Sequence, residues 1–261
     1  MLAIRPDQHR DDRSGPPDLR GDFEVHLTVE PGAAEALVGW ADGHGLKFTH
    51  ILLARGAAPS QPMLTLRANG SLDEVAAATS RTTGRLARAG FTVLRTKIEA
   101  TPWAEGVPVS DEDAVPHGAR RYFEHHVKLL LPGPLPTADL TRLADPARLA
   151  DPARLADLAE LAVRHGAHLS HNPRRIRDDG RREWFVTQRC RLVGLSTAGR
   201  RLEALLLSLA ADGREVVSVE REFVAVDSDE ALDEGWISEH EHEQNHEREQ
   251  KHEQEQEGDP R

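Results

Sequence analysis

Aromatic residues, cysteine and lysine are all scarce in this sequence of 261 residues, and each scarcity narrows what the chain can be. Aromatic residues make up 4% of the chain, so leucine, valine and alanine must build the core. The single cysteine, Cys190, excludes a disulfide framework and a cysteine-based zinc site. No apolar run approaches the roughly 20 residues of a membrane span, and the first residues lack the apolar stretch of a signal peptide. We therefore expect a cytoplasmic protein without membrane contact.

Basic residues are also fewer than acidic residues. The chain has 44 acidic and 33 basic residues and a net charge of −11, which disfavours binding to duplex nucleic acid through a basic face. Residues 1–21 are polar, and residues 238–261 are rich in Glu, Gln and His and have no apolar side chain that could dock. We expect a disordered leader over 1–21 and a disordered tail over 238–261. The tail's four histidines could collect transition metals loosely, but its composition suits a solubilising role better.

Between these ends the same order of predicted elements occurs in residues 22–103 and again in residues 122–237, with a linker over 104–121. Each half opens with a strand and continues with a helix, two strands, a second helix and a closing strand. Ser71 and Glu74 form a capping-box pattern that predicts the start of one helix. This β-α-β-β-α-β order is that of the ferredoxin-like unit. The sequence therefore predicts an α+β fold of two tandem ferredoxin-like halves in a pseudo-symmetric unit. The expected strands cover 23–29, 62–67, 91–100, 122–131, 184–193 and 215–226, with others starting at Leu46 and Ala167, and the expected helices cover 33–43, 71–89, 155–165 and 196–211.

Charged and polar side chains recur at matched positions on the strands of both halves. Residues two apart on a strand share a face of the sheet, and the sequence also places two of its four lysines, Lys97 and Lys128, on the charged face. We expect these faces to line one charged cleft, although a solvated sheet face would also alternate polar residues. The matches are Glu24 and His26 with Glu124 and His126, His50 with His168, Thr65 and Arg67 with Thr187 and Arg189, and Glu99 with Glu220 or Glu222.

Clustered ionisable groups shift one another's pKa values, as catalytic sites require. We expect His26 and His126 to act as general acid and base, with Glu99 and Glu220 completing the catalytic set. The ligand would be a phosphorylated or otherwise anionic small molecule, such as a nucleotide. The arginine-rich segment 172–182 is expected to be a loop that could reach such an anion. The expected ligand-binding residues are Thr28, Arg67, Lys97, Lys128, His168, Thr187 and Arg189.

One short motif resembles a known superfamily. His26-Leu27-Thr28-Val29 is similar to the His-x-Thr/Ser-hydrophobic motif of the 2H phosphoesterases. The resemblance implies a two-lobed α+β fold whose paired histidines act on a phosphoester, with His26 and Thr28 as one set. The second set departs from the pattern, because Lys128 stands where a hydroxyl belongs. The sheet charges also resemble those of triphosphate-tunnel enzymes, but the ExExK signature is missing. The chain also resembles a protein family common in high-GC actinobacteria, which implies no particular activity.

Two other function classes stay open. One is a metal-dependent enzyme whose ligands would be His26, His126 and glutamates of the charged face, so a divalent metal stays open as a cofactor. The other is an anion-binding sensor or scaffold without catalysis. Edge strands of ferredoxin-like units often pair, so the chain could form a homodimer.

Overall fold

Strands in this chain alternate apolar and polar side chains, and this alternation gives the folded sheet one apolar and one polar face. The computed structural model describes residues 16–131, 152–178 and 180–236, and it is a mixed α+β structure dominated by antiparallel strands. The first elements are β1 (Arg20–Val29), α1 (Ala34–Gly43), β2 (Lys47–Leu53), β3 (Ser60–Ser71), α2 (Leu72–Arg88) and β4 (Val93–Ala100). After the short helix α3 (Asp111–Ala114) come β5 (Tyr122–Leu131), α4 (Pro152–Arg164), β6 (Ala167–Ile176), β7 (Arg182–Arg191), α5 (Leu195–Ala211) and β8 (Val216–Asp227). Short 3-10 turns form η1 (Pro31–Ala33), η2 (Val115–His117) and η5 (Glu230–Asp233).

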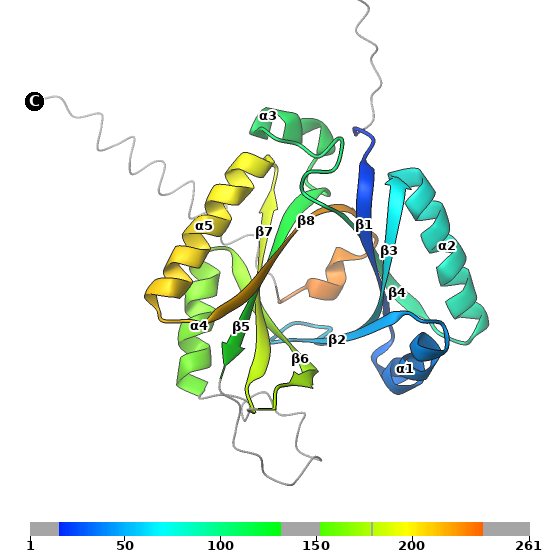
Figure 1. Ribbon diagram of the computed structural model, residues 1–261, viewed down its shortest axis with the longest axis horizontal. Helices are drawn as coiled ribbons and strands as arrows, with labels where there is room; N and C mark the ends of the chain where they lie inside the picture. The colour runs from blue at the N-terminus through cyan, green and yellow to red at the C-terminus, as the bar shows by residue number, and fades with distance from the viewer. Residues whose placement is uncertain (1–15, 132–151, 179, 237–261) are drawn as a thin grey trace, which may run out of the picture.

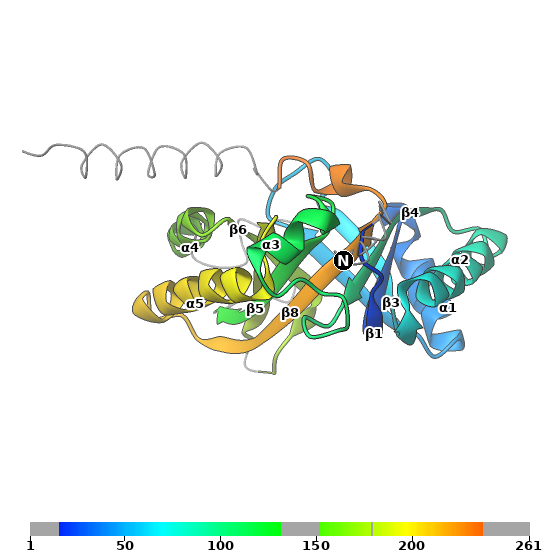
Figure 2. The ribbon, with the colours of Figure 1, turned by 90° about the horizontal axis from the view of Figure 1, so that it is seen from above.

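The strands close into one barrel in the order β1-β3-β2-β6-β7-β5-β8-β4. The first part of the chain supplies the run β4-β1-β3-β2 and the second part supplies β8-β5-β7-β6. The two runs meet edge to edge, where β4 pairs with β8 and β2 pairs with β6. Figure 1 looks along the barrel with the helices outside it, and Figure 2 shows α1 and α2 beside one run and α4 and α5 beside the other. None of the helices in the described ranges is long and apolar enough to cross a membrane.

Most apolar side chains of the strands point outward and pack under the helices in two cores. Leu27 and Leu86 are fully buried in the first core, and Val127 and Leu205 are fully buried in the second. The opposite face of the same strands therefore points into the barrel, and it carries mostly polar side chains with a few apolar ones, such as Ile51. The expected cleft between two halves is instead the interior of one closed barrel, because the halves are joined along two strand edges.

Helix α2 begins where the sequence predicts. The Ser71 hydroxyl accepts the Glu74 N–H at 3.3 Å, and the Glu74 carboxylate accepts the Ser71 N–H at 2.8 Å, so the capping-box prediction is confirmed.

Other boundaries differ from the expectation. β1 begins at Arg20, inside the expected leader, because Arg20 pairs with Ser71 on β3 and Leu19 is fully buried in the first core. The segment 172–182 is only partly a loop, since β6 continues to Ile176 and β7 begins at Arg182. Residues 1–15 of the expected leader and the whole expected tail lie outside the described residues.

Candidate functional site

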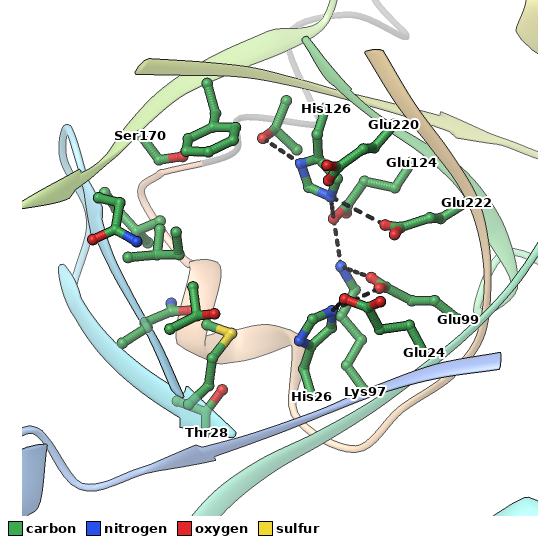
Figure 3. Close-up of a pocket in the computed structure, with 18 of the residues that line it drawn as sticks. Glu24, His26, Thr28, Lys97, Glu99, Glu124, His126, Ser170, Glu220 and Glu222 are labelled. Atoms are coloured by element: carbon green, nitrogen blue, oxygen red, sulfur yellow. Dashed lines mark hydrogen bonds and ion pairs between the residues drawn. The ribbon is translucent and has the colours of Figure 1, made fainter. Parts of the chain in front are cut away.

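The barrel encloses a cavity of about 300 Å³. An eight-stranded barrel has an interior that is either filled by side chains or just wide enough for one small ligand. Charged side chains of β1, β4, β5 and β8 line one side of this cavity, and neutral side chains of β2, β3, β6 and β7 line much of the other. In Figure 3 the histidines, Lys97 and the glutamates gather on one side, opposite Ser170 and Thr28.

His26 projects from β1 into the cavity between its neighbours on β3 and β4. The register places His26 opposite Thr65 and opposite Lys97. Its Nδ1 lies 3.1 Å from the Thr65 hydroxyl oxygen, and its Nε2 lies 3.0 Å from a carboxylate oxygen of Glu99. Burial alone would lower the pKa of His26, but the Glu99 carboxylate outweighs burial and raises it.

His126 has a corresponding environment on β5. Its Nδ1 lies 3.0 Å from the hydroxyl oxygen of Thr187, the residue opposite it on β7. Its Nε2 lies 3.1 Å from Glu124 and 3.4 Å from Glu222. Burial alone would lower the pKa of His126, but hydrogen bonds to these two carboxylates raise it to about 10.

Lys97 joins the two histidine environments. Its Nζ lies 2.6 Å from Glu99 and also contacts Glu124, and its side chain is 10% exposed. Burial alone would lower the pKa of Lys97, but Glu124 and Glu99 together raise it. A continuous chain of polar contacts therefore runs from His26 through Glu99, Lys97 and Glu124 to His126.

Glu99 and Glu222 lie in the same cluster, but their pKa values are shifted in opposite directions. Burial favours the neutral form of Glu99, yet the charge of Lys97 outweighs it and holds the pKa of Glu99 below its usual range. For Glu222, burial and the negative charge of Glu99 prevail over His126 and raise the pKa. Two carboxyls with divergent pKa values in one cavity are a common arrangement for proton transfer.

The C-terminal segment after β8 closes one end of the barrel, as the position of η5 in Figures 1 and 2 shows. The Asp233 carboxylate accepts from Gln61 at 3.0 Å, lies 2.9 Å from Arg95 and contacts Arg189. The Trp236 indole N–H donates to the carbonyl of Leu169 at 2.8 Å. Because these partners belong to different strands, the segment is attached across the barrel end.

Most of the sequence-predicted site residues do line this cavity. Two do not. Arg67 is 83% exposed and pairs with Glu24 at 3.2 Å at the barrel edge. His168 is buried with its ring 6.1 Å from the Trp236 ring, and so lies under the C-terminal segment. The predicted residues that line the cavity are His26, His126, Glu99, Glu220, Thr28, Lys97, Lys128, Thr187 and Arg189.

The strand register decides between the two glutamates of β8. Glu24 lies opposite Glu99, and Glu124 lies opposite Glu222, so Glu222 is the counterpart of Glu99. Glu220 lines the cavity but is exposed. Of the two glutamates, Glu222 is therefore the one that occupies the position equivalent to Glu99, and it contacts His126 directly.

The register also changes one other match. His168 lies opposite Thr187, and the residue opposite Thr65 is Lys47, so His50 is not the counterpart of His168. The hydroxyls that bind the histidines come from β3 and β7 rather than from Thr28 on the strand of His26.

The deep basic residues are already engaged by carboxylates. Arg189 is 5% exposed, donates to Glu124 at 2.6 Å and contacts Asp233. Arg95 is also 5% exposed and contacts Asp227 and Asp233. A ligand anion would therefore have to compete with buried carboxylates for these guanidinium groups. Sequence reasoning assigns no site role to Asp233, because it follows the last strand in an acidic segment whose aspartates lack the spacing of an EF-hand calcium loop.

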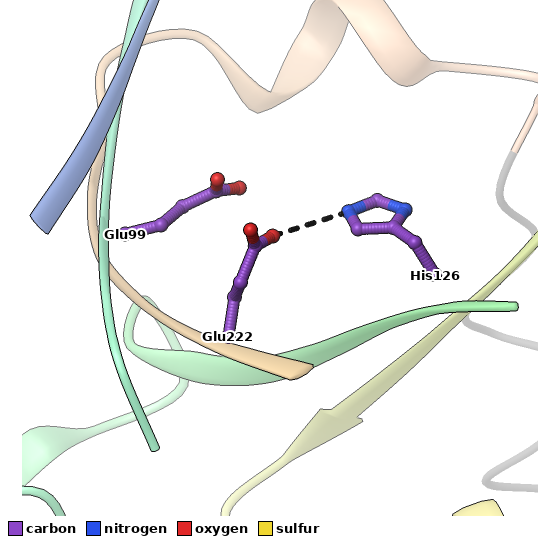
Figure 4. A group of neighbouring side chains, drawn as sticks. All are labelled: Glu99, His126 and Glu222. Atoms are coloured by element: carbon purple, nitrogen blue, oxygen red, sulfur yellow. Dashed lines mark ion pairs between the residues drawn. The ribbon is translucent and has the colours of Figure 1, made fainter. Parts of the chain in front are cut away.

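Three ligand-type side chains lie close enough to hold a metal ion. Atoms of Glu99, His126 and Glu222 lie within 4.8 Å of one another (Figure 4). Carboxylate and imidazole together suit several divalent transition metals. The ammonium of Lys97, which is 2.6 Å from Glu99, already supplies a positive charge there.

No protein-family model matches this chain, and no curated protein matches it. Among solved structures, it is similar to chlorite dismutase from Candidatus Nitrospira defluvii in complex with imidazole, with 15% identity over 82% of this chain and 94% of that one and a TM-score of 0.24. A mutant chlorite dismutase from the same organism has 13% identity over 82% of this chain and 93% of that one, also with a TM-score of 0.24. A TM-score this low does not establish a common fold and has no bearing on function.

Proposed function

We propose that the barrel interior is an active site that binds a phosphorylated or otherwise anionic small molecule and carries out acid–base chemistry on it. Phosphoester cleavage is the reaction class favoured by the His26-x-Thr28 motif. The observation that supports the proposal is the pair of carboxyls, Glu99 and Glu222, whose pKa values move in opposite directions beside two histidines in one cavity.

The energetic cost of this interior argues for a function. Removing a charged group from water costs several kcal/mol per ion even after relaxation, and a well-packed apolar interior is often at least as stable. Small barrels are normally filled by side chains. Here Lys97, Glu99 and Glu124 are at most 10% exposed and surround open space. Ionisable clusters of this kind are typical of functional sites.

The geometry suggests how the groups would divide the work. His126 and Glu222 are 3.4 Å apart, so these two groups can share one exchangeable proton and donate it to the leaving-group oxygen when water attacks the phosphorus of a phosphoester. His26, held by Glu99, is the second group with a proton to exchange. Both imidazoles carry positive charge when protonated and would stabilise negative charge that develops on the ligand.

We also infer that the two halves are tandem ferredoxin-like units related by pseudo-symmetry. Both have the element order β-α-β-β-α-β and equivalent strand orders. Their inner faces also correspond in side-chain chemistry, since His26 with Thr65 matches His126 with Thr187. Such a duplication would explain why two histidine environments meet in one cavity.

A metal-dependent reaction is the second candidate, and the spacing of Glu99, His126 and Glu222 favours it. The test is calorimetric titration of chelator-treated protein with Mn²⁺ and Zn²⁺. A site made by these residues predicts binding that is lost in Glu99→Gln. Binding that survives this substitution would place the ion elsewhere, for example on the histidines of residues 238–261.

The acid–base proposal is tested with a panel of phosphomonoesters, linear phosphodiesters and cyclic nucleotides, by measuring product release. Glu222→Gln and His126→Gln should each lower turnover by at least about 100-fold, the usual scale for a lost acid or base. Glu203→Gln is the matched control, because Glu203 is exposed on α5, outside the barrel. Full turnover in Glu222→Gln would contradict the assignment. A ligand that raises thermal stability without being converted would instead support the sensor alternative.

A further inference from the structure

Part of the cavity lining is apolar, and the acid–base proposal assigns no role to these apolar side chains. The inner faces of β2, β3 and β7 contribute Ile51, Met63 and Phe185 to the lining, with Leu53 deeper in. Ile51, Met63 and Phe185 are only partly buried although they point into the barrel.

Apolar side chains that remain partly exposed inside a barrel indicate a surface for a ligand. Ligand pockets are lined mainly by apolar and aromatic side chains, with a few polar groups that orient the ligand. A cavity of about 300 Å³ lies at the lower end of the usual range for such pockets. A small inorganic anion alone would leave this wall in contact with water.

The basic groups least engaged by carboxylates also line this cavity. Lys128 is 3.7 Å from Glu183, and Lys47 is 57% exposed and 3.8 Å from Glu24. Arg175, on β6, lines the cavity and is exposed. These ion pairs are longer than the 2.6 Å contacts that Lys97 and Arg189 make deeper inside. A ligand anion that binds this outer group of basic residues therefore breaks weaker ion pairs than one that binds Lys97 or Arg189.

We propose that the ligand is an anion with an apolar ring: the ring packs on Ile51, Met63 and Phe185, and the phosphate or carboxylate binds Lys47, Lys128 and Arg175. This inference rests on the proposed function for the location of the site and adds the class of molecule. For a phosphate ester, the P–O bond that water cleaves to give an alcohol and a free phosphate would then lie between the two ends, beside the histidines. A nucleoside monophosphate has both parts, and an aromatic carboxylate has the same two features.

The experiment compares the affinities of the full chain for AMP, adenosine, ribose phosphate and inorganic phosphate, measured by isothermal titration calorimetry. The comparison separates the contribution of the ring from that of the anion. AMP should bind at least about tenfold more tightly than any of the other three, because only AMP presents both a ring and an anion. Phenyl phosphate and benzoate then distinguish a phosphate site from a carboxylate site. Equal affinity for ribose phosphate and AMP, or for adenosine and AMP, would overturn the inference.

Two variants test which residues bind the anion and which bind the ring. Lys128→Met should weaken AMP and ribose phosphate alike, by about tenfold, the scale of one lost charge-assisted contact. Ile51→Thr keeps the β-branched shape and should weaken AMP while leaving ribose phosphate unchanged. Arg88→Met is the control, because Arg88 is exposed on α2 outside the barrel.

The outcomes also separate this inference from the proposed function. Tight binding of AMP without turnover of any phosphoester would remove the catalytic proposal and keep the ligand class. Turnover of phosphoesters that lack a ring, at the same efficiency as ring-bearing ones, would keep the catalytic proposal and overturn the ligand class. No binding by any of these probes would overturn both.

Discussion

Individual ionic contacts inside the barrel depend on one another, because most of the charged side chains there contact more than one oppositely charged group. Lys97 contacts both Glu99 and Glu124, and Glu124 also contacts Arg189 and His126. Burying such groups is unfavourable unless every charge has a partner. Removal of one member therefore leaves others uncompensated, and the effect exceeds the value of one contact.

Replacement of Lys97 by methionine tests this dependence. Lys97→Met keeps the length of the side chain but leaves Glu99 and Glu124 without their common cation, and should reduce the free energy of unfolding by about 3 kcal/mol or more. The measurement is urea denaturation at neutral pH. Lys47→Met is the matched control, because Lys47 is 57% exposed and its pair with Glu24 should contribute at most about 1 kcal/mol. Similar losses in both variants would contradict the interpretation.

The raised pKa of His126 predicts a pH dependence of stability. Burial opposes the charged imidazole, but Glu124 and Glu222 raise the pKa of His126 to about 10 in the folded chain, against about 6.5 in the unfolded chain. A raised folded pKa stabilises the fold fully below the unfolded value, and this stabilisation is lost as the pH rises to the folded value. The stability difference between wild type and His126→Gln should therefore be largest near pH 6 and shrink toward pH 10. A difference that is constant with pH would show that His126 does not titrate in this window.

Some of this residue-scale arrangement could be predicted from the sequence and some could not. The period of two in β1, β4 and β5 was enough to place His26, Lys97 and Glu124 on one face. The pairing of Lys97 with Glu124 could not be predicted, because these residues belong to strands from different halves whose relative position depends on barrel closure. Glu222 and Glu220 have the same parity, so only the register distinguishes them.

At the scale of elements, the C-terminal segment is the part that sequence patterns describe least well. η5 is one short 3-10 turn, and its attachment comes from Asp233 and Trp236 rather than from periodic apolar residues. Trp236 contributes an indole hydrogen bond to the Leu169 carbonyl, and its side chain is 5% exposed. Strands and helices have periodic patterns over many residues, which is why their positions could be predicted while this turn could not.

Asp233→Asn tests whether the segment depends on this carboxylate. The substitution keeps the size of the side chain but weakens the contacts to Arg95 and Arg189, and should cost about 2 kcal/mol of unfolding free energy, the scale of hydrogen bonds to charged groups. Urea denaturation followed by the combined fluorescence of the four tryptophans measures this loss. Asp229→Asn is the control on the same element, since Asp229 caps η5 through Ala231 and asparagine caps equally well. Equal stability of the two variants would mean that Asp233 does not hold the segment.

At the scale of the whole molecule, the sequence predicts two halves but not how they join. The joints are the β4–β8 and β2–β6 edges, and the second is short: it pairs Leu52 with His171 and Leu53 with Ser170, and the Ala54 N–H donates to the Leu169 carbonyl at 3.0 Å. Contacts between charged side chains across the interior supplement these edges, as between Lys97 and Glu124. The residue pattern of either half does not specify which strand pairs with its edge strands. The closure of the two halves into one barrel is therefore known from the structure alone.

Closure predicts that the halves unfold together, because each half alone would expose both its edge strands and its charged inner face. Single-tryptophan variants can follow each half separately: Trp40 reports on α1, and Trp184, which is 2% exposed, reports on β7. In urea the two reporters should give the same midpoint and the same slope, as a single cooperative transition requires. If the Trp40 and Trp184 midpoints differ, the halves are independently stable, and the contacts across the cavity form only after each half has folded.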